Sequence, residues 1–119
     1  MQRMANYDRT FLIDHTESIL ITGSSGFIGR QVVGHLLEKG FSNIRCLARE
    51  SSDIRGLSEI IKHKEGEGKA TIIQGNLLSI DDCLRITEGV KLIFHLAAGT
   101  GTKSFSEAYL NSVITTRNL

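Results

Sequence analysis

Three glycines spaced three residues apart are the part of this sequence best suited to chemistry. Gly23, Gly26 and Gly29 follow the apolar run at residues 19–21 and precede apolar residues at helical spacing. This succession predicts a buried strand, a tight turn and a helix N-terminus, which together aim unpaired backbone N–H groups and the positive end of the helix dipole at one point. An anionic group such as a diphosphate can bind there.

Each glycine has its own expected role in such a turn. Gly23 permits the sharp bend, Gly26 lets a phosphate approach the backbone, and Gly29 lets the helix pack closely on the strand. The position between an apolar strand and an amphipathic helix favours dinucleotide binding. The alternative is a purely structural turn, because turns use glycine in any case.

The residue expected to contact the adenosine ribose of a dinucleotide lies about 20 residues beyond the last glycine. That residue is Arg49, and Glu50 follows it. An arginine suits a 2′-phosphate and therefore favours NADP, whereas an acidic residue would bond a 2′-hydroxyl and favour NAD. The sequence predicts NADP as the cofactor, with NAD as the alternative through Glu50. A third interpretation of Arg49 is a solvated charge at a strand end.

The elements that position these residues alternate along the chain. Further strands are expected at residues 43–48, 70–74 and 90–97, and helices at about 27–39, after Ser51-Ser52-Asp53, after Ser79 and from near Ser104. Alternating strands and helices predict a parallel sheet with right-handed crossovers, and near-continuous apolar runs indicate strands covered on both faces. The fold class is α/β: a Rossmann-like doubly wound parallel sheet of about four strands in the order 3-2-1-4, with flanking helices.

The predicted domain organisation has two parts. Residues 1–17 are polar and form an N-terminal arm, and residues 18–119 form the N-terminal portion of a dinucleotide-binding domain. Four strand–helix units make little more than half of a doubly wound fold, so we expect a piece of a larger protein. The alternative is a complete small domain. The free edge of the fourth strand is expected to be covered by another chain, as in a homo-oligomer, or by the arm.

Composition narrows the class of protein. The formal net charge is +1 and 23% of residues are charged, which argues against a nucleic-acid or membrane-surface partner. The arm lacks the apolar segment of a secretory signal, and Cys46 and Cys83 are interpreted as reduced structural thiols, so a cytoplasmic location is expected. The histidines have no metal-ligand spacing, and no metal site is predicted.

Four motifs in order, covering residues 18–119, resemble the extended short-chain dehydrogenase/reductase family of NAD(P)-dependent epimerases, dehydratases and reductases. They are Thr22-Gly23-x-x-Gly26-x-x-Gly29, Gly75-Asn76-Leu77, His95-Leu96-Ala97-Ala98 and Val113-x-x-Thr116-x-Asn118-Leu119. The resemblance implies a dinucleotide cofactor and a small-molecule substrate of the full-length protein, for example a nucleotide sugar.

The resemblance also implies roles for individual residues. The pyrophosphate would be lined by Gly23, Ser25, Gly26, Phe27 and Ile28. Arg49 would contact the 2′-phosphate, Asn76 and Leu77 the adenine, and Ala97, Ala98 and Gly99 the nicotinamide-side ribose. Three residues depart from the family pattern: Asn76 replaces an acid, Ser112 an asparagine and Thr115 a glycine.

No catalytic residue can be assigned in this chain. The family transfers protons with a Tyr-x-x-x-Lys pair, and neither Tyr7 nor Tyr109 has a lysine four residues on. His95 is interpreted as a packed residue at a strand end. The main hypothesis is the cofactor-binding portion of an NAD(P)-dependent enzyme, inactive alone. The alternatives are a non-catalytic nucleotide-binding or regulatory module, and a small interaction domain that binds no dinucleotide.

Overall fold

A four-stranded parallel sheet forms the centre of the computed structural model, which describes residues 12–64, 66, 68–98 and 104–119. The strands are β1 (Ser18–Thr22), β2 (Ile44–Ala48), β3 (Ala70–Gln74) and β4 (Val90–His95). Their order is β3-β2-β1-β4, which confirms the predicted 3-2-1-4 topology. β4 ends two residues before the predicted position, because the backbone N–H groups of Leu96 and Ala97 turn to the Thr22 hydroxyl.

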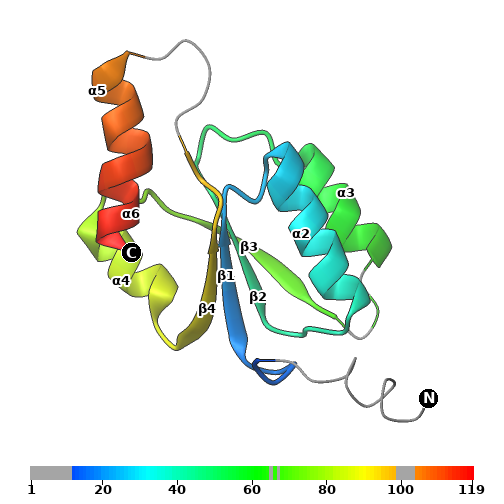
Figure 1. The fold of residues 1–119 in the computed structure, drawn as a ribbon. Coiled ribbons are helices and arrows are strands. Elements are labelled where there is room, and N and C mark those ends of the chain that lie inside the picture. The colour runs from blue at the N-terminus through cyan, green and yellow to red at the C-terminus, as the bar shows by residue number, and fades with distance from the viewer. Residues whose placement is uncertain (1–11, 65, 67, 99–103) are drawn as a thin grey trace, which may run out of the picture.

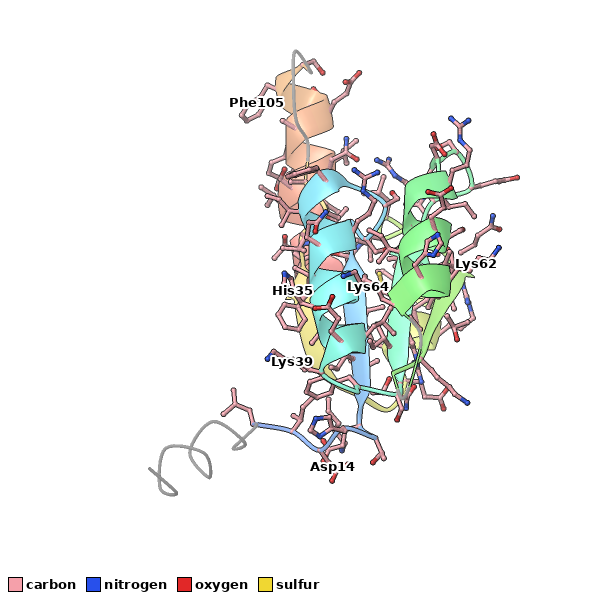
Figure 2. All side chains as sticks on the ribbon, turned by 90° about the vertical axis from the view of Figure 1, so that its right-hand side faces the viewer. Asp14, His35, Lys39, Lys62, Lys64 and Phe105 are labelled. Carbon is pink, nitrogen blue, oxygen red and sulfur yellow. The ribbon has the colours of Figure 1, made fainter. Side chains whose placement is uncertain are left out.

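Helices cover both faces of the sheet, as a doubly wound fold requires (Figure 1). On one face lie α2 (Phe27–Glu38) and α3 (Arg55–Lys64), which stand side by side in Figure 2. Lys64, labelled there, pairs with Glu38 across the two helices. On the other face lie α4 (Ile80–Thr87) and a C-terminal helix made of α5 (Phe105–Ala108), η1 (Tyr109–Ile114) and α6 (Thr115–Asn118). No helix within the described residues has both the length and the apolar character needed to cross a membrane.

Each face of the sheet has its own apolar core, which explains the near-continuous apolar strands. Alternate strand residues point to opposite faces, so β1 contributes Ile19 and Ile21 to one core and Leu20 to the other. The two cysteines are buried and free, one in each core. Burial raises the pKa of the Cys46 thiol to about 12, as expected of an unreactive structural residue.

Glycines with positive φ follow two of the helices. Gly40 has φ 84° and follows Lys39, the C-cap of α2, and Gly89 has φ 72° and precedes β4. These left-handed conformations stop the helices without the steric cost that a side chain would add. At the start of α3, Asp53 accepts a hydrogen bond from the Arg55 backbone N–H at 3.1 Å.

The C-terminal helix contains a π-helical stretch, η1, that the sequence analysis did not foresee. The backbone N–H of Thr115 bonds to the carbonyl of Leu110, five residues back. The carbonyl of Asn111 accepts from Thr115 Oγ1 at 2.9 Å, and that of Ser112 accepts from Thr116 Oγ1 at 2.6 Å. Two consecutive threonines therefore satisfy carbonyls in the wider turn.

The described part of the N-terminal arm, residues 12–17, lies at the amino ends of the strands. The His15 carbonyl accepts from the Ser42 backbone N–H at 2.9 Å, and its ring stacks on Phe41 with centroids 4.5 Å apart. Ile13 packs against the core, whereas Leu12 is exposed. Within the described residues, no strand pairs with the free edge of β4. Phe11 and the rest of the arm lie outside that part.

Candidate functional site

A cavity of about 280 Å³ opens at the carboxyl ends of the strands. This is where ligands bind in doubly wound sheets, next to the point where strand order reverses. Eight residues predicted from the sequence line it: Gly23, Ser25, Gly26, Arg49, Asn76, Leu77, Ala97 and Ala98. The topology thus brings together residues from all four strand ends.

Two glycines of the β1–α2 turn are required by the fold itself. Gly23 has φ 65°, and a Cβ there would lie 2.7 Å from the carbonyl carbon of Leu96. A Cβ at Gly29 would collide with the Gly23 carbonyl oxygen and lie 2.7 Å from the Ser24 Cα. Neither backbone neighbour can move away easily, so both positions need glycine to hold β1, β4 and α2 together.

Gly26 is different, because the protein leaves more room around it. A Cβ there would meet only the Gly23 carbonyl oxygen, at 3.3 Å. Its φ of −75° and ψ of 172° are those of a helix N-cap, yet no side chain caps α2. In the described part of the chain, the backbone N–H groups of Phe27 and Ile28 have no hydrogen-bond partner. This turn fits a pyrophosphate, which needs free N–H donors and a close approach to the backbone.

Ser24 holds this turn in place, although the sequence analysis did not single it out. Its side chain is fully buried, and its hydroxyl donates to the Leu47 carbonyl at 2.9 Å. The bond ties the glycine turn to the end of β2, and thereby sets the distance between the turn and Arg49. A serine between two glycines gives no sequence signal for such a contact, because turns favour serine anyway.

Arg49 follows β2 and lines both the cavity and an adjoining groove of about 530 Å³. The turn after it is closed by Ser52, whose hydroxyl accepts from the Arg49 backbone N–H at 3.2 Å and whose own N–H donates to the Arg49 carbonyl at 3.0 Å. The Arg49 guanidinium is exposed and forms no hydrogen bond or ion pair with any described residue. It is therefore available to an anionic ligand.

The β3–α4 junction positions Asn76 through its own side chains. Asp82 Oδ2 accepts from the Asn76 backbone N–H at 2.8 Å, and Ser79 Oγ caps α4 by accepting from the Asp82 N–H at 3.2 Å. Asn76 Oδ1 accepts from the Leu78 N–H at 2.9 Å, so one of its lone pairs is used locally. The Asn76 amide keeps its N–H donors for a ligand. Asp82 thus positions this loop as well as favouring the helix start.

A chain of hydrogen bonds joins β1, β4 and the C-terminal helix beneath the cavity. Thr22 Oγ1 accepts from the N–H groups of Leu96 and Ala97 at 3.0 and 3.1 Å, so its own proton donates to His95 Nδ1 at 2.7 Å. The ring then carries its proton on Nε2, which donates to Thr116 Oγ1 at 2.8 Å. Burial lowers the pKa of His95, which favours the neutral ring. The structure thus makes His95 a packed residue, as expected.

The remaining predicted residues lie outside the cavity lining or outside the described residues. The side chains of Phe27 and Ile28 are exposed, and neither residue lines the cavity. Gly99 lies outside the described residues.

Asn111 and Thr115 line the cavity from the C-terminal helix. The sequence did not reveal Asn111, because a π-helical turn changes which side of a helix each residue occupies. Among the described residues, no group of three or more His, Cys, Asp or Glu side chains could hold a metal ion.

The sequence is similar to a family of known enzymes. The family model described as the NAD dependent epimerase/dehydratase family matches residues 19–119. Dihydroflavonol 4-reductase of Callistephus chinensis is 27% identical over 84 residues, which are 71% of this chain and 23% of that protein. An uncharacterized UDP-glucose epimerase of Bacillus subtilis is 34% identical over 92 residues, 72% of this chain and 28% of that protein. The chain thus spans about a quarter of the length of these relatives.

Solved structures share the fold at low identity. A candidate short-chain dehydrogenase/reductase from Burkholderia xenovorans matches with a TM-score of 0.74 at 15% identity, covering 89% of this chain and 50% of that one. A uronate dehydrogenase variant from Agrobacterium tumefaciens, complexed with NAD, matches with a TM-score of 0.64 at 19% identity, covering 87% of this chain and 35% of that one. A candidate dehydrogenase from Burkholderia cenocepacia with bound NADP matches with a TM-score of 0.65 at 12% identity, covering 87% of this chain and 42% of that one.

Proposed function

The chain belongs to the NAD-dependent epimerase/dehydratase family, and we propose that its cavity binds NADP as the cofactor-binding portion of a reductase- or epimerase-type enzyme. One observation carries the proposal: the uncapped N-terminus of α2 opens, through the Gly26 turn, onto a cavity that Arg49 also lines. The nicotinamide, when bound, would supply hydride chemistry, and the protein would supply binding and orientation.

Each wall of the cavity has a distinct proposed part in holding the dinucleotide. The backbone around Gly23, Ser25 and Gly26, with the free N–H groups of Phe27 and Ile28, would bind the pyrophosphate. Asn76 and Leu77 would contact the adenine, and the backbone of Ala97, Ala98 and Gly99 would pass beneath the nicotinamide-side ribose. The Thr22–His95 chain would keep the residues after β4 in place.

The choice of NADP over NAD rests on Arg49, whose guanidinium has no partner among the described residues and lines the cavity. We expect Arg49→Ala to weaken NADPH binding by roughly 10-fold or more and NADH binding far less, because only NADPH loses a charge-assisted hydrogen bond. Calorimetric titration of both cofactors measures this. Equal losses for both would assign Arg49 no role at the 2′-phosphate.

Binding itself is tested by thermal unfolding with and without saturating cofactor. A ligand present at about 100 times its dissociation constant stabilises the folded state by about 2.7 kcal/mol, which shifts the unfolding midpoint measurably. An unchanged midpoint with both NADPH and NADH would instead favour a small interaction domain without a dinucleotide.

The wider proposals concern the full-length protein. We expect proton transfer from a Tyr-x-x-x-Lys pair outside residues 1–119, a small-molecule substrate such as a nucleotide sugar, a cytoplasmic location, and a homo-oligomer that covers the free edge of β4. The fragment alone would be inactive. A turnover assay of the full-length product separates this enzyme from a non-catalytic or regulatory module, since both bind the cofactor and only the enzyme turns over.

A further inference from the structure

Arg30, in the first turn of α2, is a partly buried cation whose donors are unused. Its Nε is sealed from solvent and has no hydrogen-bond partner, and no described residue accepts a hydrogen bond from its guanidinium. Buried N–H groups are nearly always paired, and leaving one unpaired costs free energy. Arg30 lines neither cavity, but its unpaired guanidinium lies beside Gly56, close to the loop that follows β2. An unpaired cation there calls for an explanation, and an anionic ligand provides one.

The surroundings of Arg30 place it beside the loop that follows β2. The side chain lies on the open face of Gly56 in the first turn of α3, where a Cβ would overlap Nη1 and lie 3.2 Å from Cδ. A glycine inside a helix costs roughly 1 kcal/mol relative to alanine. Glycine at position 56 thus destabilises α3 slightly, but it leaves the space that the Arg30 side chain occupies.

The same loop carries Arg49 at its beginning and lies beside Arg30 at its end. Residues 49–53 form a tight turn closed by the two Ser52–Arg49 hydrogen bonds, and Ser52 lines the cavity. At the far end of the turn, the pKa of Asp53 is lowered to about 2 by hydrogen bonds from Arg55, with Arg30 adding a smaller electrostatic contribution. Arg30 and Arg49 therefore approach one loop from its two ends.

The acid in this loop does not consume the charge of Arg30. Asp53 is held by Arg55, with Nε–Oδ1 at 3.0 Å and Nη2–Oδ2 at 2.8 Å, so that pair is complete without Arg30. A purely structural ion pair would place the Arg30 guanidinium in hydrogen-bond contact with a carboxylate. The unpaired cation instead adds its positive potential to that of Arg49 near the loop, whose Ser51 and Ser52 line the groove and the cavity.

We propose that Arg30 is the second cation of a clamp for a phosphate monoester, the 2′-phosphate on the adenosine ribose of the dinucleotide, with Arg49 as the first. This inference rests on the proposed function. A guanidinium presents its donors in a planar fork that matches phosphate, and two such forks can hold one dianionic group from both sides. Arg30 is thus a specificity-determining residue that distinguishes NADPH from NADH.

Calorimetric titration of the chain with NADPH, NADH and 2′,5′-ADP tests the clamp. We expect Arg30→Gln to weaken NADPH and 2′,5′-ADP binding about 10- to 100-fold, with NADH changed less than about twofold. Arg30→Lys keeps the charge and the stem but loses the fork, so about threefold to tenfold loss is expected even if the glutamine variant folds poorly. Arg117→Gln, which removes one exposed charge on the opposite face, is the control and should change none of the three.

The outcomes separate the inference from the proposed function. If the wild-type chain binds both dinucleotides and Arg30→Gln weakens them equally, or weakens neither, the clamp is wrong and dinucleotide binding stands. If the wild-type chain binds neither dinucleotide nor 2′,5′-ADP, both proposals fail. Inorganic phosphate is the probe for a free anion: competition against NADPH as strong as that of 2′,5′-ADP would overturn the assignment to a ribose phosphate.

Discussion

The β1–α2 and β3–α4 junctions lie at the same edge of the sheet but treat the start of their helices in opposite ways. At β3–α4, Ser79 caps the helix, and Asp82 reaches back to the Asn76 backbone N–H at 2.8 Å. At β1–α2, Gly26 occupies the N-cap position and no side chain caps the helix. One junction caps its helix with a side chain, and the other leaves the first N–H donors of its helix without a side-chain acceptor.

The difference shows that two junctions of the same topology can differ in whether a side chain caps the helix. Both helices follow the carboxyl end of a parallel strand, so the helix dipole points the same way at each junction. What differs is the presence of an oxygen-bearing side chain at the N-cap. We expect a helix start to bind an anion when no local side chain caps it.

The largest expected effect comes from Gly29, which lets α2 pack closely on β1 at the β1–α2 junction. Gly29→Ala would drive a Cβ into the Gly23 carbonyl oxygen and the Ser24 Cα, forcing α2 away from β1. We expect a loss of more than about 3 kcal/mol of folding free energy, and cofactor binding would be lost with it. Urea unfolding measures the loss. Gly66→Ala, where a Cβ would meet nothing within 4 Å, is the matched control and should be nearly neutral.

A capping side chain at the β1–α2 junction should lower cofactor affinity while leaving folding stability nearly unchanged. Gly26→Ser places a hydroxyl at a residue whose φ of −75° and ψ of 172° suit an N-cap, so stability should change by less than about 1 kcal/mol. Dinucleotide affinity should fall by roughly 10-fold or more, because the side chain occupies the approach of the pyrophosphate. Paired unfolding and titration measurements check this. Undiminished affinity would show that the pyrophosphate does not approach Gly26.

Removing the Ser79 cap of the β3–α4 junction should have the opposite effect: stability should fall, and cofactor affinity should change little. Ser79→Ala deletes the hydroxyl that accepts from the Asp82 N–H and should cost about 1 kcal/mol of stability. Dinucleotide affinity should change less than about threefold, because the backbone of Asn76 stays held by Asp82. Urea unfolding and calorimetry measure the two quantities. A large loss of affinity with unchanged stability would contradict the division between the junctions.

The smallest expected effect is a pH dependence of folding stability through His95, which bonds to Thr22 at the β1–α2 junction. Burial lowers the pKa of His95 below its ordinary 6.5, so the unfolded chain binds the proton more readily than the folded one. The contribution to stability is therefore present above pH 6.5 and is lost as the pH falls through the folded pKa. Urea midpoints measured across this range should fall less steeply for His95→Gln than for the wild type. Identical slopes would show that another group is responsible.

Much of the fold could be predicted because its determinants are local. The apolar run before Gly23, the spacing of the glycines and the alternation of strands and helices depend on neighbours in sequence, and they were sufficient to give the strand order. The cavity followed, because parallel strands in that order bring Gly23, Arg49, Asn76 and Ala97 to one edge. The end of β4 was placed too late, because the Thr22 hydroxyl takes the backbone N–H groups that would have continued the strand.

By itself, the sequence determined the periodic and local features of this protein: four apolar strands, glycines where the backbone must bend, and an arginine after the second strand. Only the tertiary structure decided which polar groups are satisfied. The hydrogen bonds of Thr22, His95 and Thr116 join residues far apart in the sequence, and Arg30 of α2 contacts Gly56 of α3. The physical reason is that a hydrogen bond depends on the distance between atoms in space, which spacing along the chain does not specify.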